Sequence, residues 1–191
     1  PPATNAPCVL VSERPSHPGD ERHSARPSSG GTVPAMAVDY FLKVDGIPGE
    51  SVDAKHKGEI DVLAFSWGVN HAGTSGSGRA ASKALFEDLL VVARTSKASP
   101  LLWLACAQGA HIKSAVLTCR RAGKAPVEFL QILLTEVVVS SYEIDGDEEP
   151  PLDQIALAYA KIETRYTPVD PTGKAQPPVK AVWDLKAGKK A

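Results

Sequence analysis

Two long segments that are apolar on both faces constrain the fold of this 191-residue chain more than any other feature. In residues 128–142 the even positions carry Leu130, Ile132, Leu134 and Val138, and the odd positions carry Phe129, Leu133, Val137 and Val139. Residues 152–167 show the same pattern, with Ile155, Leu157 and Tyr159 opposite Ala156, Ala158, Ala160 and Ile162. An antiparallel strand with one solvated face alternates between apolar and polar residues. In a small domain the second face therefore needs a cover. We favour another subunit, and a helix is the alternative.

Shorter strands and one helix are predicted around these segments. The other strands are expected at residues 39–46, 60–71, 85–95, 114–121 and 178–186, between turns rich in glycine, proline or acidic residues. In the second of them one face is expected to hold Leu63, Phe65, Trp67 and Val69. Residues 99–109 fit a helix with Ser99 as N-cap, Pro100 in the first turn and Gly109 at the stop. The pattern predicts a mainly β fold, a compact antiparallel β-barrel or sandwich with one flanking α-helix.

The character of the sequence changes at Met36, the single methionine. Residues 1–35 are rich in proline, serine and arginine and lack apolar periodicity, so we expect them to be disordered. We expect the functional chain to begin at Met36. The preceding extension would then be a tag, a vector remnant or a translated upstream stretch, and residues 36–191 would form one domain.

Composition narrows the partners and the compartment. A formal net charge of −1 gives no reason to expect nucleic acid or an anionic membrane as partner. No apolar run reaches the roughly 18 residues that span a bilayer, and no secretory signal pattern is present. The three cysteines form no disulfide framework, which fits a reduced compartment. We therefore expect folding in the cytoplasm.

Candidate catalytic motifs are weak. The stretch 73–80 approaches a phosphate-binding P-loop, but Arg79 and Ala80 stand where Lys and Ser/Thr are required, so a mobile loop is the prediction. Cys106 and His111 lie close in sequence, yet Cys106 belongs to the apolar helix segment. A free cysteine in such a position usually acts as a small core residue, and the same applies to Cys119 on its predicted strand.

Metal-binding patterns are equally weak. None of the five histidines stands at zinc-ligand spacing from another histidine or a cysteine. The carboxylates of residues 145–149 are expected to form a solvated acidic loop, with a weak divalent-ion site as the alternative. The chain is therefore predicted to need no cofactor or metal, to lack enzymatic activity, and to have a structural or binding role.

Several segments in combination resemble the Hcp (haemolysin-coregulated protein) family. The resemblance spans residues 36–191, and residues 1–35 have no counterpart in it. The segments that carry it are 36–51, 60–68, the Ser99-Pro100 helix with Ala105-Cys106, 127–130, 137–142 and 178–184.

This resemblance implies a structural subunit of the bacterial type VI secretion machine. Hcp proteins form a compact β-barrel with a flanking helix, which assembles as a homohexameric ring, and the rings stack into an inner tube. A contractile sheath expels the tube, so the subunit leaves the bacterial cytoplasm and is secreted without a signal peptide. The implied partners are copies of the chain and the sheath, tip and effector proteins of the machine, with effectors carried in the ring lumen. Neither nucleic acid binding nor membrane insertion is expected.

The resemblance also implies where copies meet. By position, the family's ring-stacking loop corresponds to about residues 71–83, and its candidate residues are His71, Gly73, Ser75, Gly76, Gly78, Arg79 and Lys83. A ring of identical subunits needs a head-to-tail interface that closes. The strands with two apolar faces supply candidate interface residues, which are Leu130, Ile132, Leu134, Val138, Ala156 and Ala158.

Two other functions remain open. A monomeric or dimeric β-barrel module that binds a ligand or a protein would show a ligand-sized cavity and form no ring. An enzyme such as a cysteine hydrolase would need an exposed and reactive Cys106 or Cys119.

Overall fold

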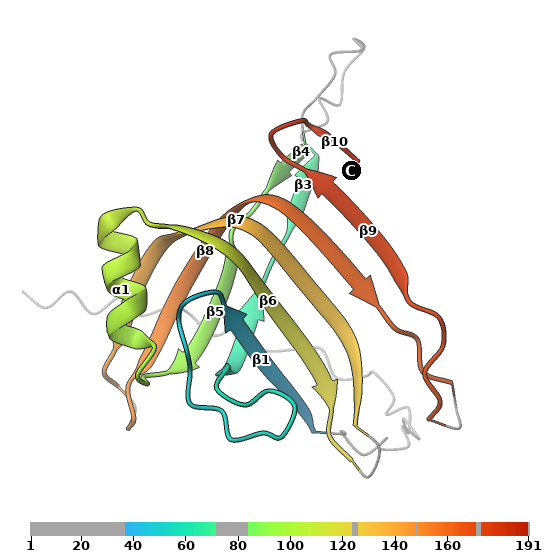
Figure 1. Cartoon of the computed structure of the whole chain (residues 1–191), viewed down its shortest axis with the longest axis horizontal. Coiled ribbons are helices and arrows are strands. Elements are labelled where there is room, and N and C mark those ends of the chain that lie inside the picture. Colours follow the sequence, from blue (N-terminus) through green and yellow to red (C-terminus); the bar gives the residue numbers. More distant parts are fainter. Residues whose placement is uncertain (1–36, 72–83, 124–125, 148, 171–172, 191) are drawn as a thin grey trace, which may run out of the picture. The chain divides into compact units, whose positions relative to one another are not determined.

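Six antiparallel strands close into a barrel (Figure 1). In their order around the barrel they are β1 (Val38–Val44), β2 (Ile60–Ser66), β5 (Leu89–Arg94), β8 (Leu152–Tyr166), β7 (Val127–Asp145) and β6 (His111–Arg121). The long β7–β8 pair, from Leu130↔Tyr166 to Asp145↔Leu152, closes the circle. The computed structural model describes residues 37–71, 84–123, 126–147, 149–170 and 173–190, all within the unit Ala35–Ala191. The predicted mainly β barrel fold is confirmed.

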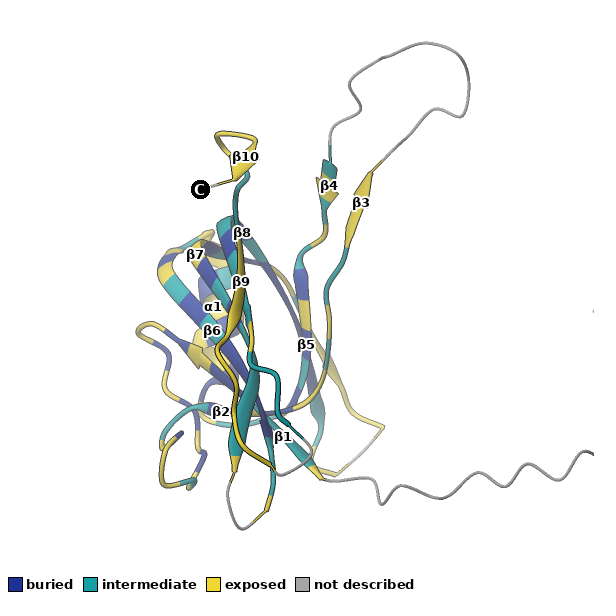
Figure 2. Cartoon of the chain, turned by 90° about the vertical axis from the view of Figure 1, so that its right-hand side faces the viewer, coloured by how far each residue is buried: buried dark blue, intermediate teal, exposed yellow. Residues whose placement is uncertain are grey.

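Four short strands extend this barrel. The first half of β8 pairs with β5, and its second half pairs with β9 (Val179–Asp184), which continues into β10 (Lys189–Lys190). β3 (Val69–His71) and β4 (Ala84–Phe86) form a separate two-stranded sheet. This sheet projects from one end of the barrel, beside the β9–β10 turn (Figure 2).

The two apolar faces of β7 have a cause within the chain. Buried positions are even at Ile132 and Leu134 but odd at Val137 and Val139. The change of inward face occurs around Glu136, whose φ is +52°. Even-numbered residues of β7 therefore face the core before Glu136, and odd-numbered residues face it after Glu136. A second subunit is not needed to bury these four side chains.

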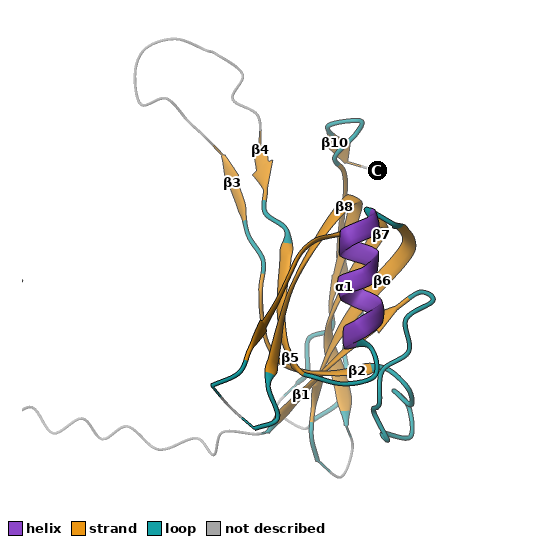
Figure 3. Ribbon diagram, turned by 90° about the vertical axis from the view of Figure 1, so that its left-hand side faces the viewer, coloured by secondary structure: helices purple, strands orange, loops and turns teal. Residues whose placement is uncertain are grey.

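The predicted helix is present as α1 (Ser99–Gln108), which packs against β7 on the side of the barrel (Figure 3). Its side chains Leu102 and Ala105 join the barrel core. The helix ends as predicted at Gly109, whose φ of 58° suits glycine and whose N–H bonds back to the last turn. α1 thus supplies part of the cover that the apolar strands require.

The prediction that Ser99 caps the helix is wrong. Ala98 precedes the first turn, and no side chain caps it. Ser99 is the first helical residue, and its hydroxyl donates a hydrogen bond to Asp153 of β8. The Thr95 hydroxyl donates to the same carboxylate at 2.8 Å. Because Asp153 is only 2% exposed, these bonds tie the start of the helix to the barrel.

Two predicted strands are interrupted. Residues 60–71 divide into β2 and β3 at Gly68, and residues 85–95 divide into β4 and β5, because the chain leaves the barrel there to form the hairpin. The shared face predicted for the first segment is only partly present, because the register shifts between Val62 and Ala64: Phe65 and Trp67 pack against the core, but Val69 is 48% exposed. Ile60 and Val62 face the core, whereas Leu63 is 41% exposed.

Candidate functional site

The base of the β3–β4 hairpin is fixed by one tyrosine. The Trp67 Nε1–H donates to the Tyr159 hydroxyl at 2.5 Å, and that hydroxyl donates to the backbone oxygen of Glu87 at 3.0 Å. Gly68 closes the hairpin base by accepting the Glu87 N–H at 3.0 Å. Burial raises the pKa of Tyr159, so the phenol remains a neutral donor. The hairpin therefore leaves the barrel in a defined direction.

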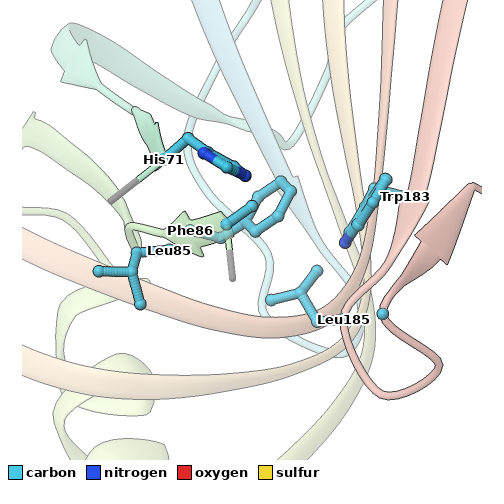
Figure 4. A pocket seen from close by; sticks show the side chains of 7 residues that line it. His71, Leu85, Phe86, Trp183 and Leu185 are labelled. Atoms are coloured by element: carbon cyan, nitrogen blue, oxygen red, sulfur yellow. The ribbon is translucent and has the colours of Figure 1, made fainter. Parts of the chain in front are cut away.

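An apolar groove separates this hairpin from the β9–β10 turn. Its volume is about 430 Å³, and Figure 4 shows His71, Phe86, Leu185 and Trp183 close to one another, with Leu85 directed away from them. Phe86 of the hairpin stacks on Trp183 of β9, with ring centroids 5.7 Å apart. Leu85 is 58% exposed. The lining residues are His71, Ala84, Leu85, Phe86, Trp183, Leu185 and Gly188. An open groove with aromatic walls is a surface on which another molecule can bury apolar area.

The predicted stacking loop begins beside this groove. His71 is the last residue of β3 and lines the groove. The remaining candidates fall outside the described residues: Gly73, Ser75, Gly76, Gly78, Arg79 and Lys83. The P-loop-like stretch lies outside them as well.

The predicted interface residues divide between core and surface. Ile132, Leu134 and Ala156 are 3%, 1% and 7% exposed, so burial within the subunit already uses most of their area. Leu130 is half-buried and lies apart, near the Tyr166 end of the β7–β8 pair.

Val138 and Ala158 form the surface part of that prediction. The two residues are cross-strand partners and are both half-buried. They line a shallow hollow of about 350 Å³ together with Leu185 and Lys186. The structure thus brings these two residues together at the surface.

Other exposed apolar residues were not singled out from the sequence. On α1 they are Leu101, Trp103 and Leu104, each at least 40% exposed. Val52, in the loop between β1 and β2, is 95% exposed. The exposed apolar side chains of the helix could have been found from the sequence, because none of the residues in this helix is charged. Val52 had none.

The β1–β2 loop is held to the barrel by a charged cluster. Arg120 of β6 donates from Nη2 to Asp53 at 2.7 Å and to Asp39 at 2.9 Å. The Arg120 hydrogen bond, together with N–H donors from Lys55 and His56, holds the pKa of Asp53 well below its usual range. The same carboxylates raise the pKa of Arg120. The loop is therefore anchored by a permanent ion pair at neutral pH.

The described candidate residues for catalysis and metal binding do not form a centre. Burial raises the pKa of Cys119 to about 11, so its thiol is a poor nucleophile, and Cys106 is half-buried on α1. Within the described residues, no group of three or more His, Cys, Asp or Glu side chains could hold a metal ion. No helix in the described part is long and apolar enough to cross a membrane.

Comparisons with known proteins match most of the chain. The sequence profile of the family described as type VI secretion system effector, Hcp, matches residues 41–166. Protein hcp1 of Pseudomonas aeruginosa is 39% identical over 157 residues, which cover 79% of this chain and 97% of that protein.

Solved structures show the same likeness. A structure of a type six secretion system protein superposes with a TM-score of 0.76 at 33% identity, covering 81% of this chain and all of the other. Hcp1 from Salmonella typhimurium superposes with a TM-score of 0.69 at 33% identity, covering 82% of this chain and all of the other.

Proposed function

Because this chain belongs to the Hcp family of the type VI secretion system, we propose that it is a structural subunit of the inner tube of that machine. In this proposal the barrel, residues 36–191, assembles as a homohexameric ring. The rings stack into a tube that is built in the bacterial cytoplasm and then expelled with its cargo. The partners are other copies of the chain and the sheath, tip and effector proteins, and the chain is not an enzyme. Residues 1–35 are dispensable for assembly.

The observation that carries this proposal is the extent of the match. The relative from P. aeruginosa is covered over 97% of its length, so the likeness extends over nearly the whole of that protein. The physical properties of the surface agree with an assembling subunit. Apolar side chains are exposed at the groove, on α1 and at Val52, whereas a protein that works alone usually keeps such patches small.

Ring closure requires two different surfaces of one subunit to meet. We propose that Val138 and Ala158, in their hollow beside Leu185, form part of one such surface. Burying them against a neighbour would remove apolar area from water without disturbing the barrel core. The interface role of Leu130, Ile132, Leu134 and Ala156 is proposed only for the area that these residues leave exposed.

A substitution on this surface tests the ring. We expect Val138→Asp to reduce the mass in solution from the hexamer to the single subunit, because a buried unpaired carboxylate opposes the contact. Tyr166→Phe, on the exposed end of β8, is the control and should keep the ring. A Val138→Asp protein that stays hexameric would remove this residue from the interface.

A monomeric binding module remains the second candidate. The observation in its favour is the groove, because about 430 Å³ lies in the size range of roughly 300–1,000 Å³ that is typical of ligand sites. This function predicts a wild-type protein with the mass of one subunit at every concentration.

A further inference from the structure

The β3–β4 hairpin is attached to the barrel mainly at its base. β3 and β4 form a sheet of their own, and among the described residues neither strand pairs with a strand of the barrel. All three residues of β3 are exposed (Figure 2). An isolated two-stranded hairpin is at best marginally stable in water. The order of this hairpin therefore depends on the contacts between its base and the barrel.

Two side-chain contacts supply this attachment, and both come from the last strands of the chain. The hydroxyl of Tyr159, on β8, accepts from the Trp67 N–H and donates to the backbone oxygen of Glu87. The ring of Trp183, on β9, stacks on Phe86 with ring centroids 5.7 Å apart. The order of the hairpin thus depends on the positions of two side chains, one on each of these strands.

The same part of the barrel lines the shallow hollow of about 350 Å³. Tyr159 is one of the residues that line it. Leu185, just after β9, lines the hollow and also lies beside Phe86 and Trp183 in the apolar groove (Figure 4). The Leu185 N–H donates to the backbone oxygen of Ala160 at 2.9 Å, and Ala160 lines the hollow as well. One piece of structure therefore forms a wall of the hollow and supports the hairpin.

The outer edge of this wall is held weakly in a single subunit. Lys186 forms an ion pair with Glu136, which joins the β9–β10 turn to β7, but the two side chains are 70% and 58% exposed. An ion pair so open to water contributes little to stability. Val138 and Ala158, which also line the hollow, are only half-buried. Covering the hollow would remove apolar surface from water and restrict this wall at the same time.

The hairpin and the hollow affect each other through shared side chains. When the hairpin base detaches, Tyr159 loses both of its hydrogen-bond partners, and Leu185 loses Phe86 beside it. Both residues line the hollow, so the shape of the hollow is then less well defined. A surface that covers the hollow binds less well to a subunit in that state, because it must first order these two side chains.

We propose that the covering of the hollow by a neighbouring copy and the attachment of the hairpin are coupled through Tyr159 and Leu185. A neighbour in contact with the hollow raises the fraction of subunits whose hairpin is attached. The coupling is reciprocal, so an attached hairpin strengthens the contact at the hollow by the same factor. This inference rests on the proposed tube function and on the subunit contact proposed at Val138 and Ala158. It adds a regulation to that contact, because the hairpin becomes ordered when the subunit joins a ring.

Hydrogen exchange measured by mass spectrometry tests the effect of the ring on the hairpin. Peptides that contain β3 and β4 are compared between wild-type rings and single subunits of the Val138→Asp protein. The proposal predicts that these peptides exchange at least about fivefold faster in the single subunits. Equal exchange in the two proteins overturns it. A Val138→Asp protein that stays hexameric places the ring contact elsewhere and overturns the coupling as well.

Direct covering of the hairpin by another copy would also slow its exchange. Tyr159→Phe separates the two causes, because in its rings the neighbour is present while the link to the hairpin is cut. β3 and β4 should exchange as fast in these rings as in the single subunits. Trp67→Phe removes the donor on the other side of the same hydrogen bond and should give the same result if Tyr159→Phe folds poorly. Slow exchange in the rings of both variants overturns the proposal.

Dilution of the rings tests the effect of the hairpin on the ring. Trp67 does not line the hollow, yet Trp67→Phe rings should dissociate at a protein concentration at least about fivefold higher than wild-type rings, as measured by light scattering. Gly49→Ala is the matched control, because its new methyl group overlaps the backbone at Glu59, in a loop that lines neither the hollow nor the groove. Its rings should dissociate like the wild type. Equal weakening by both changes would reflect a general loss of stability and overturns the proposal.

The two proposals fail in different ways. A wild-type protein with the mass of one subunit at every concentration contradicts the tube function. Wild-type rings that form, but whose hairpin exchange and dissociation do not respond to these variants, contradict only the coupling.

Discussion

Removing one hydroxyl at the base of the hairpin should destabilise the whole barrel. Tyr159 is 9% exposed, and its hydroxyl is shared by the Trp67 N–H and the Glu87 carbonyl, so Tyr159→Phe breaks two hydrogen bonds without changing the shape of the ring. In the described part of the structure, no other side chain forms a hydrogen bond with the Trp67 N–H or with the Glu87 backbone oxygen. The change therefore isolates the contribution of the link between hairpin and barrel.

The expected cost follows from the groups left unpaired. A buried donor or acceptor that loses its partner costs about 1–3 kcal/mol. Trp67 is half-buried, so water can replace part of its lost bond, and the lower part of that range applies to it. We expect a loss of about 2 kcal/mol in the free energy of unfolding. In a domain of this size 1 kcal/mol lowers Tm by roughly 2–4 °C, so the melting temperature should fall by about 4–8 °C.

Thermal and urea unfolding at one fixed protein concentration measure this change, because assembly makes the apparent stability depend on concentration. Tyr166→Phe is the matched control, since it removes the same hydroxyl from a tyrosine that is 49% exposed. The control should remain within about 0.5 kcal/mol of the wild type. If Tyr159→Phe lost no more stability than Tyr166→Phe, the hydroxyl would not be holding the hairpin base.

Three further predictions concern other parts of the barrel. Because Arg120 depresses the pKa of Asp53 below its ordinary value of 3.8, this pair stabilises the fold above about pH 4, and the contribution is lost as the pH falls further. Asp53→Asn should therefore flatten the acid side of a plot of Tm against pH. An unchanged plot would contradict the ion pair. Gly49→Ala should lower the free energy of unfolding, measured in urea, by about 1–3 kcal/mol, because the new methyl group overlaps the backbone at Glu59. In Gly146→Ala the methyl group meets no atom within 4 Å, so this variant should be as stable as the wild type. Equal stability of the two variants would refute the crowding at Gly49. Cys119 has a pKa of about 11 and is 1% exposed, so iodoacetamide should not label it in the folded protein but should label it after unfolding. Peptide mass mapping measures this. Rapid labelling of the native protein would show that this part of the core opens.

Local signals in the sequence predicted much of this fold. The stop of the helix at Gly109 follows from a backbone conformation that glycine adopts easily, and the long strands follow from runs of apolar and β-branched residues. The assignment of faces failed where the backbone changes direction. The inward parity of β7 switches near Glu136, and no residue type in that segment announces a positive φ.

Long-range contacts were beyond local reasoning. Ser99 resembles a helix cap, but Asp153, 54 residues away, takes its hydrogen bond. The exposed position of Val52 depends on Asp53 pairing with Arg120, 67 residues away in the sequence. The groove likewise forms only when the hairpin and the last strands come together. Predicting such features requires the fold first, because the sequence alone does not show which distant side chains meet.

The mass of the protein in solution tests the central claim most directly. Light scattering after size exclusion would be applied to the full chain and to a chain shortened to begin at Met36. The account predicts about six times the 20.1 kDa of the chain for the first, and a hexamer of the shorter subunit for the second. A single-subunit mass for both proteins would contradict the tube function and leave the binding module in its place.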